Sequence, residues 1–312
     1  MILSRIVTQW QGIQNKIGPG AKLLYAKAAR SMTAHRQVLQ KRSKLQNKPD
    51  VVIMSVGEAS DWSGEAKSRS NLHLPGMQEE LVKAIYATGK PVVVLINAGR
   101  PLIFNWTADH VPAILYTWWL GTEAGDAIAD VLFGDYNPSA KLPISFPRTE
   151  GQIPIYYSYY NTGRPATSDS DRFYRSAYID LSIYPKFPFG FGLSYTNFDY
   201  SNIVLSGSVL RANQPIKSNG HCFKHGKLRR GRNCAIIYTG PGWFRGTTRK
   251  RIERISKNFL KKGESKQVSF TIDVNKLRFY NAELKYIYEP GDFKLFIGGN
   301  SQNVKEASFK LQ

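Results

Sequence analysis

The hydrophobic pattern is clearest in the first half of the chain. Continuous apolar runs at 50–57, 90–99 and 113–119 are bounded by polar residues, which is typical of strands buried on both faces of a parallel sheet. Residues 75–89 and 123–133 carry apolar residues at helical spacing. This succession of strands and helices predicts an α/β sheet covered by helices.

Local signals set the expected bounds of these elements and add two more. Pro75 fits the first position of a helix, and Gly89 is a typical stop. A loosely helical spacing predicts a helix within 3–17, and an apolar stretch predicts a short strand at 22–28. Residues 29–48 are basic and polar, with no clear period.

The pattern changes after Asp135. Pro- and aromatic-rich segments with many turn residues predict ordered loops. Alternating apolar positions at 198–205, 266–274 and 291–299 then predict half-buried strands. We therefore predict an α/β sandwich domain over 1–195 followed by a β-sandwich over 196–312.

One part of the β-sandwich region does not fit. Residues 211–262 mix Gly, Arg and isolated aromatics, and neither the helical nor the strand period survives there. The same segment holds 15 Lys/Arg and one acid, for a net +14 within a chain of net +20. Residues 1–50 contribute a further +9, which leaves −3 for the rest of the chain.

The positive charge raises the question of a polyanionic partner. A strongly basic protein can bind nucleic acid or an acidic membrane surface. The basic cluster here belongs to no recognisable nucleic-acid module, so the sequence predicts non-specific polyanion binding at most and no specific nucleic-acid partner. No apolar run approaches 18 residues, so we expect no membrane span.

Compartment and cofactors are weakly constrained. The N-terminus does not look like a signal peptide, and two cysteines, Cys222 and Cys234, are too few for a disulfide framework. The histidines lack metal-ligand spacing and no GxGxxG fingerprint is present, so no metal or cofactor is expected.

Several long motifs give the chain a family resemblance. They are GEASDWSGEAKSRSNLHLPGMQEEL, GKPVVVLINAGRPL, TWWLGTEAGDAIADVLFGDYNPSAKLPISFPRTEGQIPIYY and YPKFPFGFGLSYTNFDY. In this order they resemble the C-terminal half of glycoside hydrolase family 3, of the periplasmic β-glucosidase type. The resemblance is strong over 51–210 and 259–312 and weaker over 1–28.

The resemblance implies a fold and a reaction. Members have an N-terminal (β/α)8 barrel, an α/β sandwich domain and often a fibronectin type III-like β-sandwich, and they are periplasmic or secreted. Their active site lies between the first two domains. The reaction is retaining hydrolysis of β-glucosides or related oligosaccharides, with a barrel aspartate as the nucleophile and a glutamate on a sandwich-domain loop as the acid/base.

The resemblance also assigns residues in the loop after the first strand. Glu65 matches the acid/base position, with Glu58 as the rival; Glu58 can instead be a structural carboxylate at a strand end. Trp62 is expected to stack on a sugar or to pack on its own domain, and Arg69 to contact substrate or to position the loop by a salt bridge. Asp61 sits in a Ser-Asp-Trp triplet like that of the family nucleophile, but in the wrong domain.

Two tryptophans end the apolar run at 113–119. Trp118 and Trp119 are expected to pack in the core. Without the resemblance, Glu65 would be an ordinary solvated loop acid.

Two departures from the family limit the function. The barrel, which would be a partner of these domains, should precede Met1, so the chain carries the acid/base loop but no nucleophile. We expect it to be inactive without a barrel; the alternative is a non-catalytic fragment or pseudoenzyme with a carbohydrate-associated binding role. We further hypothesise that 211–258 is translated out of frame, with the frame restored near 259; other-frame translation of the DNA without family-like strands would contradict this.

Overall fold

The computed structural model describes residues 5–26, 49–159, 163–225, 233–239, 241–243, 252 and 254–312. The chain forms two compact units, one of residues 1–133 and 146–153 and one of 134–145 and 154–312. The domain bounds 1–195 and 196–312 stay a prediction, because the loops at 134–145 and 154–195 group with the second unit.

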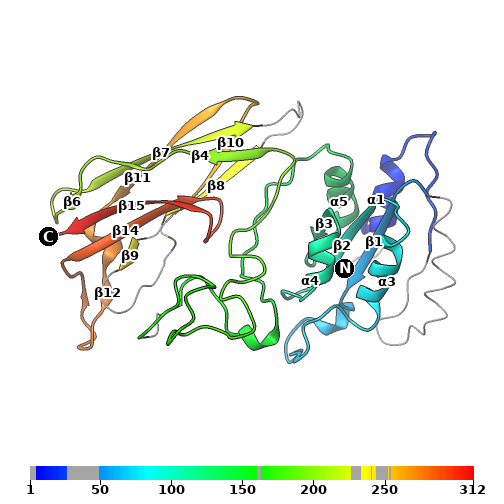
Figure 1. Cartoon of the computed structure of the whole chain (residues 1–312). Coiled ribbons are helices and arrows are strands. Elements are labelled where there is room, and N and C mark those ends of the chain that lie inside the picture. The colour runs from blue at the N-terminus through cyan, green and yellow to red at the C-terminus, as the bar shows by residue number, and fades with distance from the viewer. Residues whose placement is uncertain are drawn as a thin grey trace. The chain divides into compact units, whose positions relative to one another are not determined.

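The first unit is built on a parallel sheet in the order β1–β2–β3 (Figure 1). The strands are β1 Val52–Gly57, β2 Val92–Asn97 and β3 Ala113–Tyr116. Val94 and Ile96 of the central strand are fully buried. The continuous apolar runs therefore predicted the three parallel strands correctly, although each strand is shorter than its run. The expected burial is found along most of β2, but β1 is partly buried and the four residues of β3 are half-buried.

Helices lie around this sheet (Figure 1). They are α1 Gln9–Lys16, α3 Gln78–Tyr86, α4 Asn105–His110 and α5 Ala124–Leu132. The predicted start of α3 at Pro75 is wrong, because Gly76 has φ +58°, outside the helical region, so the helix begins only after it. The sequence did not predict α4, whose six residues are too few to establish a period.

The N-terminal helix is fixed by a cap and by close backbone packing. The Thr8 side chain accepts a hydrogen bond from Gln11 N–H, and the Gln11 side chain accepts one from Thr8 N–H, which forms a capping box. A Cβ on Gly12 would lie 2.1 Å from the carbonyl oxygen of Gly125, so only glycine permits this approach of α1 to α5. The strand predicted at 22–28 is wrong for 22–26, which have no strand partner; 27–48 lie outside the described residues.

The second unit contains the predicted β-sandwich. One sheet has the order β11–β7–β4, with β5 also pairing with β7, and the other has the order β6–β15–β14–β9. Two further pairs are β10–β8 and β12–β13. The strands are β4 Asn197–Tyr200, β5 Val204–Leu205, β6 Val209–Leu210, β7 Ile216–His225, β8 Asn233–Thr239, β9 Pro241–Trp243, β10 Arg254–Leu260, β11 Ser265–Ile272, β12 Phe279–Tyr280, β13 Tyr286–Ile287, β14 Gly291–Gly298 and β15 Val304–Leu311.

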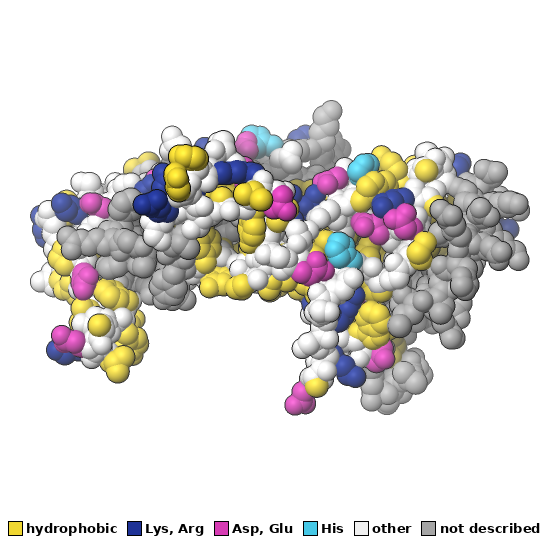
Figure 2. Space-filling view, turned by 60° about the horizontal axis from the view of Figure 1, so that its bottom comes forward, with side chains coloured by type: hydrophobic (Ala, Val, Ile, Leu, Met, Phe, Trp, Pro, Cys, Tyr) yellow, Lys and Arg dark blue, Asp and Glu magenta, His cyan; other side chains and the backbone are white. Residues whose placement is uncertain are grey.

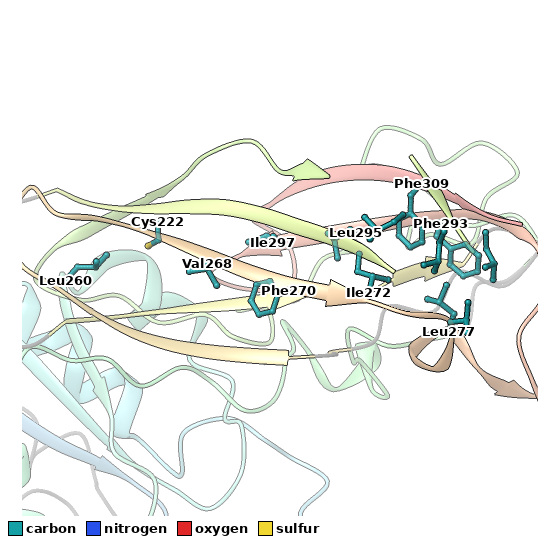
Figure 3. Packing of buried hydrophobic residues seen from close by; sticks show 14 residues of the cluster. Cys222, Leu260, Val268, Phe270, Ile272, Leu277, Phe293, Leu295, Ile297 and Phe309 are labelled. Carbon is teal, nitrogen blue, oxygen red and sulfur yellow. The ribbon is translucent and has the colours of Figure 1, made fainter. Parts of the chain in front are cut away.

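Inward-facing side chains of these strands form one hydrophobic core (Figure 3). β11 contributes Val268, Phe270 and Ile272 at every second position. Phe293 and Phe309 stack with ring centroids 5.5 Å apart. The alternation read from the sequence at 266–274 and 291–299 is therefore that of strands with one buried face.

The expectation that no strand period survives in 211–262 is wrong at its start. In β7 every second residue from Ile216 to Lys224 is buried, and the residues between them are exposed except Asn219, which is half-buried. Its inward positions include Ser218, Gly220 and Lys224, and the Lys224 ammonium donates to the carbonyl of Leu260 at 3.0 Å. The strand period of β7 cannot be read from the sequence because three of its five buried residues, Ser218, Gly220 and Lys224, are small or polar. Residues 226–232 and 244–251, and the side chains of 233–243, lie outside the described residues.

Candidate active site

The carboxyl ends of the three parallel strands share one edge of the sheet. Loops at 58–77, 98–104 and 117–123 leave from it. In open α/β sheets this edge is the usual place for a ligand site. Gly57, at the end of β1, has φ +127°, and a Cβ there would lie 1.9 Å from the carbonyl oxygen of Asn97. Glycine therefore allows the first loop to leave β1 directly beside β2.

Glu58 is the first residue of that loop, and its carboxylate is buried. Its side chain has no exposed surface. Arg69 Nη1 donates to Oε1 at 2.6 Å, and Arg100 Nε lies 3.0 Å from the same oxygen. The Ser63 hydroxyl donates to Oε2 at 3.2 Å. A carboxylate held by two guanidinium groups is a structural anchor, which is the reading that the sequence left open for Glu58.

Glu65 lies at the tip of a turn in the same loop and is exposed. Lys67 N–H donates to the carbonyl of Gly64 at 3.3 Å, which makes Glu65 and Ala66 the two central residues. Ala66 has φ +58°, the left-handed conformation that a type II turn requires at its second central position. The turn therefore presents the Glu65 carboxylate outward.

Trp62 and Arg69, the predicted substrate-binding residues, lie against each other. The Arg69 guanidinium lies 4.9 Å from the centroid of the Trp62 ring, and its Nη2 donates to the carbonyl of His73 at 3.2 Å. Together with the Glu58 contact, these bonds direct Arg69 inward and support its role in positioning the loop. Trp62 is half-buried, and Asp61 is exposed in the short helix η3 Ser60–Trp62. Contact of Trp62 or Arg69 with a sugar stays a prediction.

Sequence reasoning missed Arg100, which follows β2. Its Nη2 donates to the carbonyls of Trp62 and Lys67, the latter at 2.8 Å. The only signal was an arginine at the end of a buried strand, in the quoted motif GKPVVVLINAGRPL. Such a residue emerges at the same sheet edge as the loop after β1.

The two tryptophans after β3 have different environments. Trp118 packs against Phe146, with centroids 5.9 Å apart, as core packing predicts. Core packing is wrong for Trp119, which is 42% exposed. The chain is not extended here, because Trp118 has φ +56°; its ring joins Tyr116 and Phe146, while the Trp119 ring stays outside this aromatic group. Trp119 Nε1 lies 2.7 Å from where a Cβ on Gly99 would be, which puts it beside the first two loops at this edge.

The far end of the first loop is tied to Glu150. Leu72 N–H donates to Glu150 Oε1 at 2.8 Å, and His73 Nε2 lies 3.7 Å from Oε2. Burial raises the pKa of Glu150, but the Leu72 N–H, further backbone hydrogen bonding and the charges of His73 and Arg69 together lower it below its ordinary value. The ionised carboxylate is therefore the form that the folded loop favours.

We expect this carboxylate to make the first unit sensitive to acid. A pKa lowered by folding stabilises the protein above the unfolded-state pKa, and this stabilisation disappears as the pH falls through the folded-state pKa. Wild type should thus be more stable than Glu150→Gln at pH 7, and the difference should shrink below about pH 4.5. Urea unfolding of both proteins from pH 7 to pH 3 measures this; a constant difference would contradict it.

Charged side chains of both signs lie on the surface of the described residues. Figure 2 shows acidic and basic side chains interspersed on the visible face of the described residues. The segments with the excess positive charge, 29–48 and much of 211–262, lie outside the described residues. The polyanion binding predicted from these segments therefore stays a prediction. Among the described residues no group of three His, Cys, Asp or Glu could hold a metal ion. None of their helices is long and apolar enough to cross a membrane.

Comparison with known proteins gives two family matches. The glycosyl hydrolase family 3 C-terminal domain matches residues 2–195. The fibronectin type III-like domain matches residues 244–301.

Relatives and solved structures agree with these matches. The chain is 40% identical to the periplasmic β-glucosidase of Salmonella typhimurium, covering 99% of this chain and 43% of that protein. It is 35% identical to a β-xylosidase of Formosa agariphila, covering 95% and 40%. The structure of a β-glucosidase from Listeria innocua with gluconolactone superposes with a TM-score of 0.90 at 29% identity, over 99% of this chain and 42% of that one. The chain thus spans about two fifths of the length of the relatives it matches.

Proposed function

The chain belongs to glycosyl hydrolase family 3, and from this membership we propose that it is the C-terminal part of a retaining β-glycosidase of the β-glucosidase type. It supplies the acid/base loop, and a barrel domain supplies the nucleophile and most of the sugar pocket. The proposal rests mainly on the exposure of Glu65 at the tip of a turn. The loop that contains this turn is anchored by an ion cluster formed by the buried Glu58 carboxylate with Arg69 and Arg100.

The chemistry requires two carboxylates with different tasks. One attacks the anomeric carbon, while the other protonates the leaving oxygen and later accepts a proton from water. In retaining enzymes the two groups lie about 5–5.5 Å apart. An acid/base must also hold its proton near neutral pH, which burial or a neighbouring carboxylate achieves by raising its pKa. A barrel that covers the loop would bury the exposed Glu65 carboxylate.

Complementation tests the proposal. The chain is mixed with the N-terminal portion of the Salmonella typhimurium periplasmic β-glucosidase that it does not match, and hydrolysis of aryl β-glucosides and β-xylosides is followed. We expect neither part to be active alone and the mixture to release the aglycone. The β-xyloside is included because one relative is named a β-xylosidase.

The second candidate function is a non-catalytic fragment that associates with carbohydrate. An inactive mixture in which the chain has bound the barrel portion would support this candidate and contradict the first.

The location of the protein is a further part of the proposal. One relative is named periplasmic, so we place this protein in the periplasm or outside the cell. Fractionation of the source cells with an antibody against the chain tests this, and a purely cytoplasmic signal would contradict it.

A further inference from the structure

Arg100 lies at the centre of the contacts that hold the turn carrying Glu65. The same nitrogen of its guanidinium, Nη2, donates to the carbonyl of Trp62 and to that of Lys67. These carbonyls stand three residues before and two residues after Glu65 in the sequence. One planar group therefore ties the chain just before the turn, and the last residue of the turn, to the loop that follows β2.

Glu58 in turn fixes the orientation of Arg100. Arg100 Nε lies 3.0 Å from Glu58 Oε1 and 3.3 Å from Oε2, so it faces both carboxylate oxygens. The Arg100 side chain is only 18% exposed, and the Glu58 carboxylate is fully buried. Hydrogen bonds between buried ionised groups are short and directional, which limits the rotation of the guanidinium.

The turn needs such support. Ala66 holds a left-handed conformation that costs a non-glycine residue about 1–2 kcal/mol. Glu65 is exposed, so no burial of its own side chain fixes its place. Among the described contacts, the single hydrogen bond within the turn is the 3.3 Å bond between Lys67 and Gly64. The two hydrogen bonds from Arg100 therefore add to the weak hold of this single bond.

We propose that Arg100 is a positioning residue that sets the place of the Glu65 carboxylate through the Trp62 and Lys67 carbonyls, with Glu58 acting through Arg100. The inference rests on the proposed acid/base role of Glu65 for its catalytic consequence. Proton donation to a leaving oxygen demands accurate placement, and a displacement of about 1 Å can cost about 100-fold in rate. Lys67 and Trp62 then serve through their backbone, so their side chains are replaceable for this purpose.

Hydrogen exchange of the full chain tests the structural half of the inference. In Arg100→Ala we expect the amides of Trp62 and Lys67 to exchange at least about 10-fold faster, while those of β2 keep their protection. Non-denaturing guanidinium should restore the protection. Arg172→Ala is the matched control, because Arg172 also donates to two backbone carbonyls, those of Asp169 and Ile179, in the second unit. It should leave residues 59–68 unchanged.

Arg100→Lys keeps the test decisive if the alanine variant does not fold. A lysine keeps the charge but lacks the planar fork, so we expect faster exchange confined to 59–68. Unchanged exchange in this segment for the folded variants would overturn the inference. Faster exchange throughout the first unit in Arg100→Lys would overturn it too, because Arg100 would then be a general stabilising residue.

The complemented enzyme tests the catalytic half. Arg100→Lys should lower kcat about 10- to 100-fold on β-glucosides with poor leaving groups, with KM nearly unchanged and a smaller loss of rate on activated aryl glycosides, whose departure needs no proton. A uniform rise in KM would overturn positioning in favour of direct sugar contact. If Glu65→Gln leaves turnover unchanged, the proposed function fails, and the exchange result still decides whether Arg100 places the turn.

Discussion

Replacing Glu58 by alanine is expected to lower the free energy of unfolding of the first unit by about 3–5 kcal/mol. The substitution removes a fully buried carboxylate from between two guanidinium groups, those of Arg69 and Arg100. Both positive charges would remain largely buried, 16% and 18% exposed, without their common counter-ion. Breaking a buried ion pair from one side costs more than the pair contributes, because an uncompensated charge remains.

Urea unfolding followed by hydrogen exchange of peptides from β1, β2 and β3 measures this, since it reports on the first unit separately from the second. Glu80→Ala is the control, because Glu80 is exposed and forms a surface pair with Lys83 at 2.7 Å. Surface pairs contribute little, so the control should resemble wild type. A Glu58 variant as stable as the control would show that the cluster is not an anchor.

Replacing Glu65 by alanine in the complemented enzyme is expected to lower the rate by about 100- to 10,000-fold for substrates with poor leaving groups. Such substrates need a proton on the departing oxygen, whereas activated aryl glycosides leave without one. Loss on the activated substrates should therefore be smaller, and azide should partly restore it by replacing the water that Glu65 would activate. Stability should not change, because Glu65 is exposed.

Asp61→Asn is the matched control for Glu65. Asp61 is another exposed acid of the same loop, in the short helix four residues earlier. Steady-state rates on a series of aryl β-glucosides with graded leaving groups distinguish the two. An equal loss for both variants, or an unchanged rate for Glu65→Ala, would remove Glu65 from the acid/base role.

The sequence determined the elements whose signal is local. A strand buried on both faces is apolar at nearly every position, so β2 stood out as a continuous run; β1 stood out as well, although its Ser55 is polar and exposed. α5 and the strands β11 and β14 were equally visible, because each carries its buried face at a regular period. The long family motifs were also local, and they led to the fold class and family before any contact was known.

Other elements depended on partners that the sequence does not reveal. β7 was missed because its neighbours accept Ser218, Gly220 and Lys224 on the buried face. The segment 22–26 looked like a strand, but none pairs with it. The sequence predicted core packing for both tryptophans, but only Trp118 packs against Phe146, and Trp119 is exposed. In each case the residue type alone does not decide whether the residue is buried or paired, because this depends on the elements that pack against it.

The loop after β1 shows the same division. Its sequence, through the resemblance, was enough to nominate Glu65, Trp62 and Arg69. The ion pairs of Glu58 with Arg69 and Arg100 became visible only in the tertiary structure. Arg100 is 42 residues from Glu58 in the sequence, and the two meet because β1 and β2 are neighbouring parallel strands. Parallel strands bring their carboxyl ends to one edge whatever the length of chain between them. A contact made in this way leaves no period or spacing in the sequence.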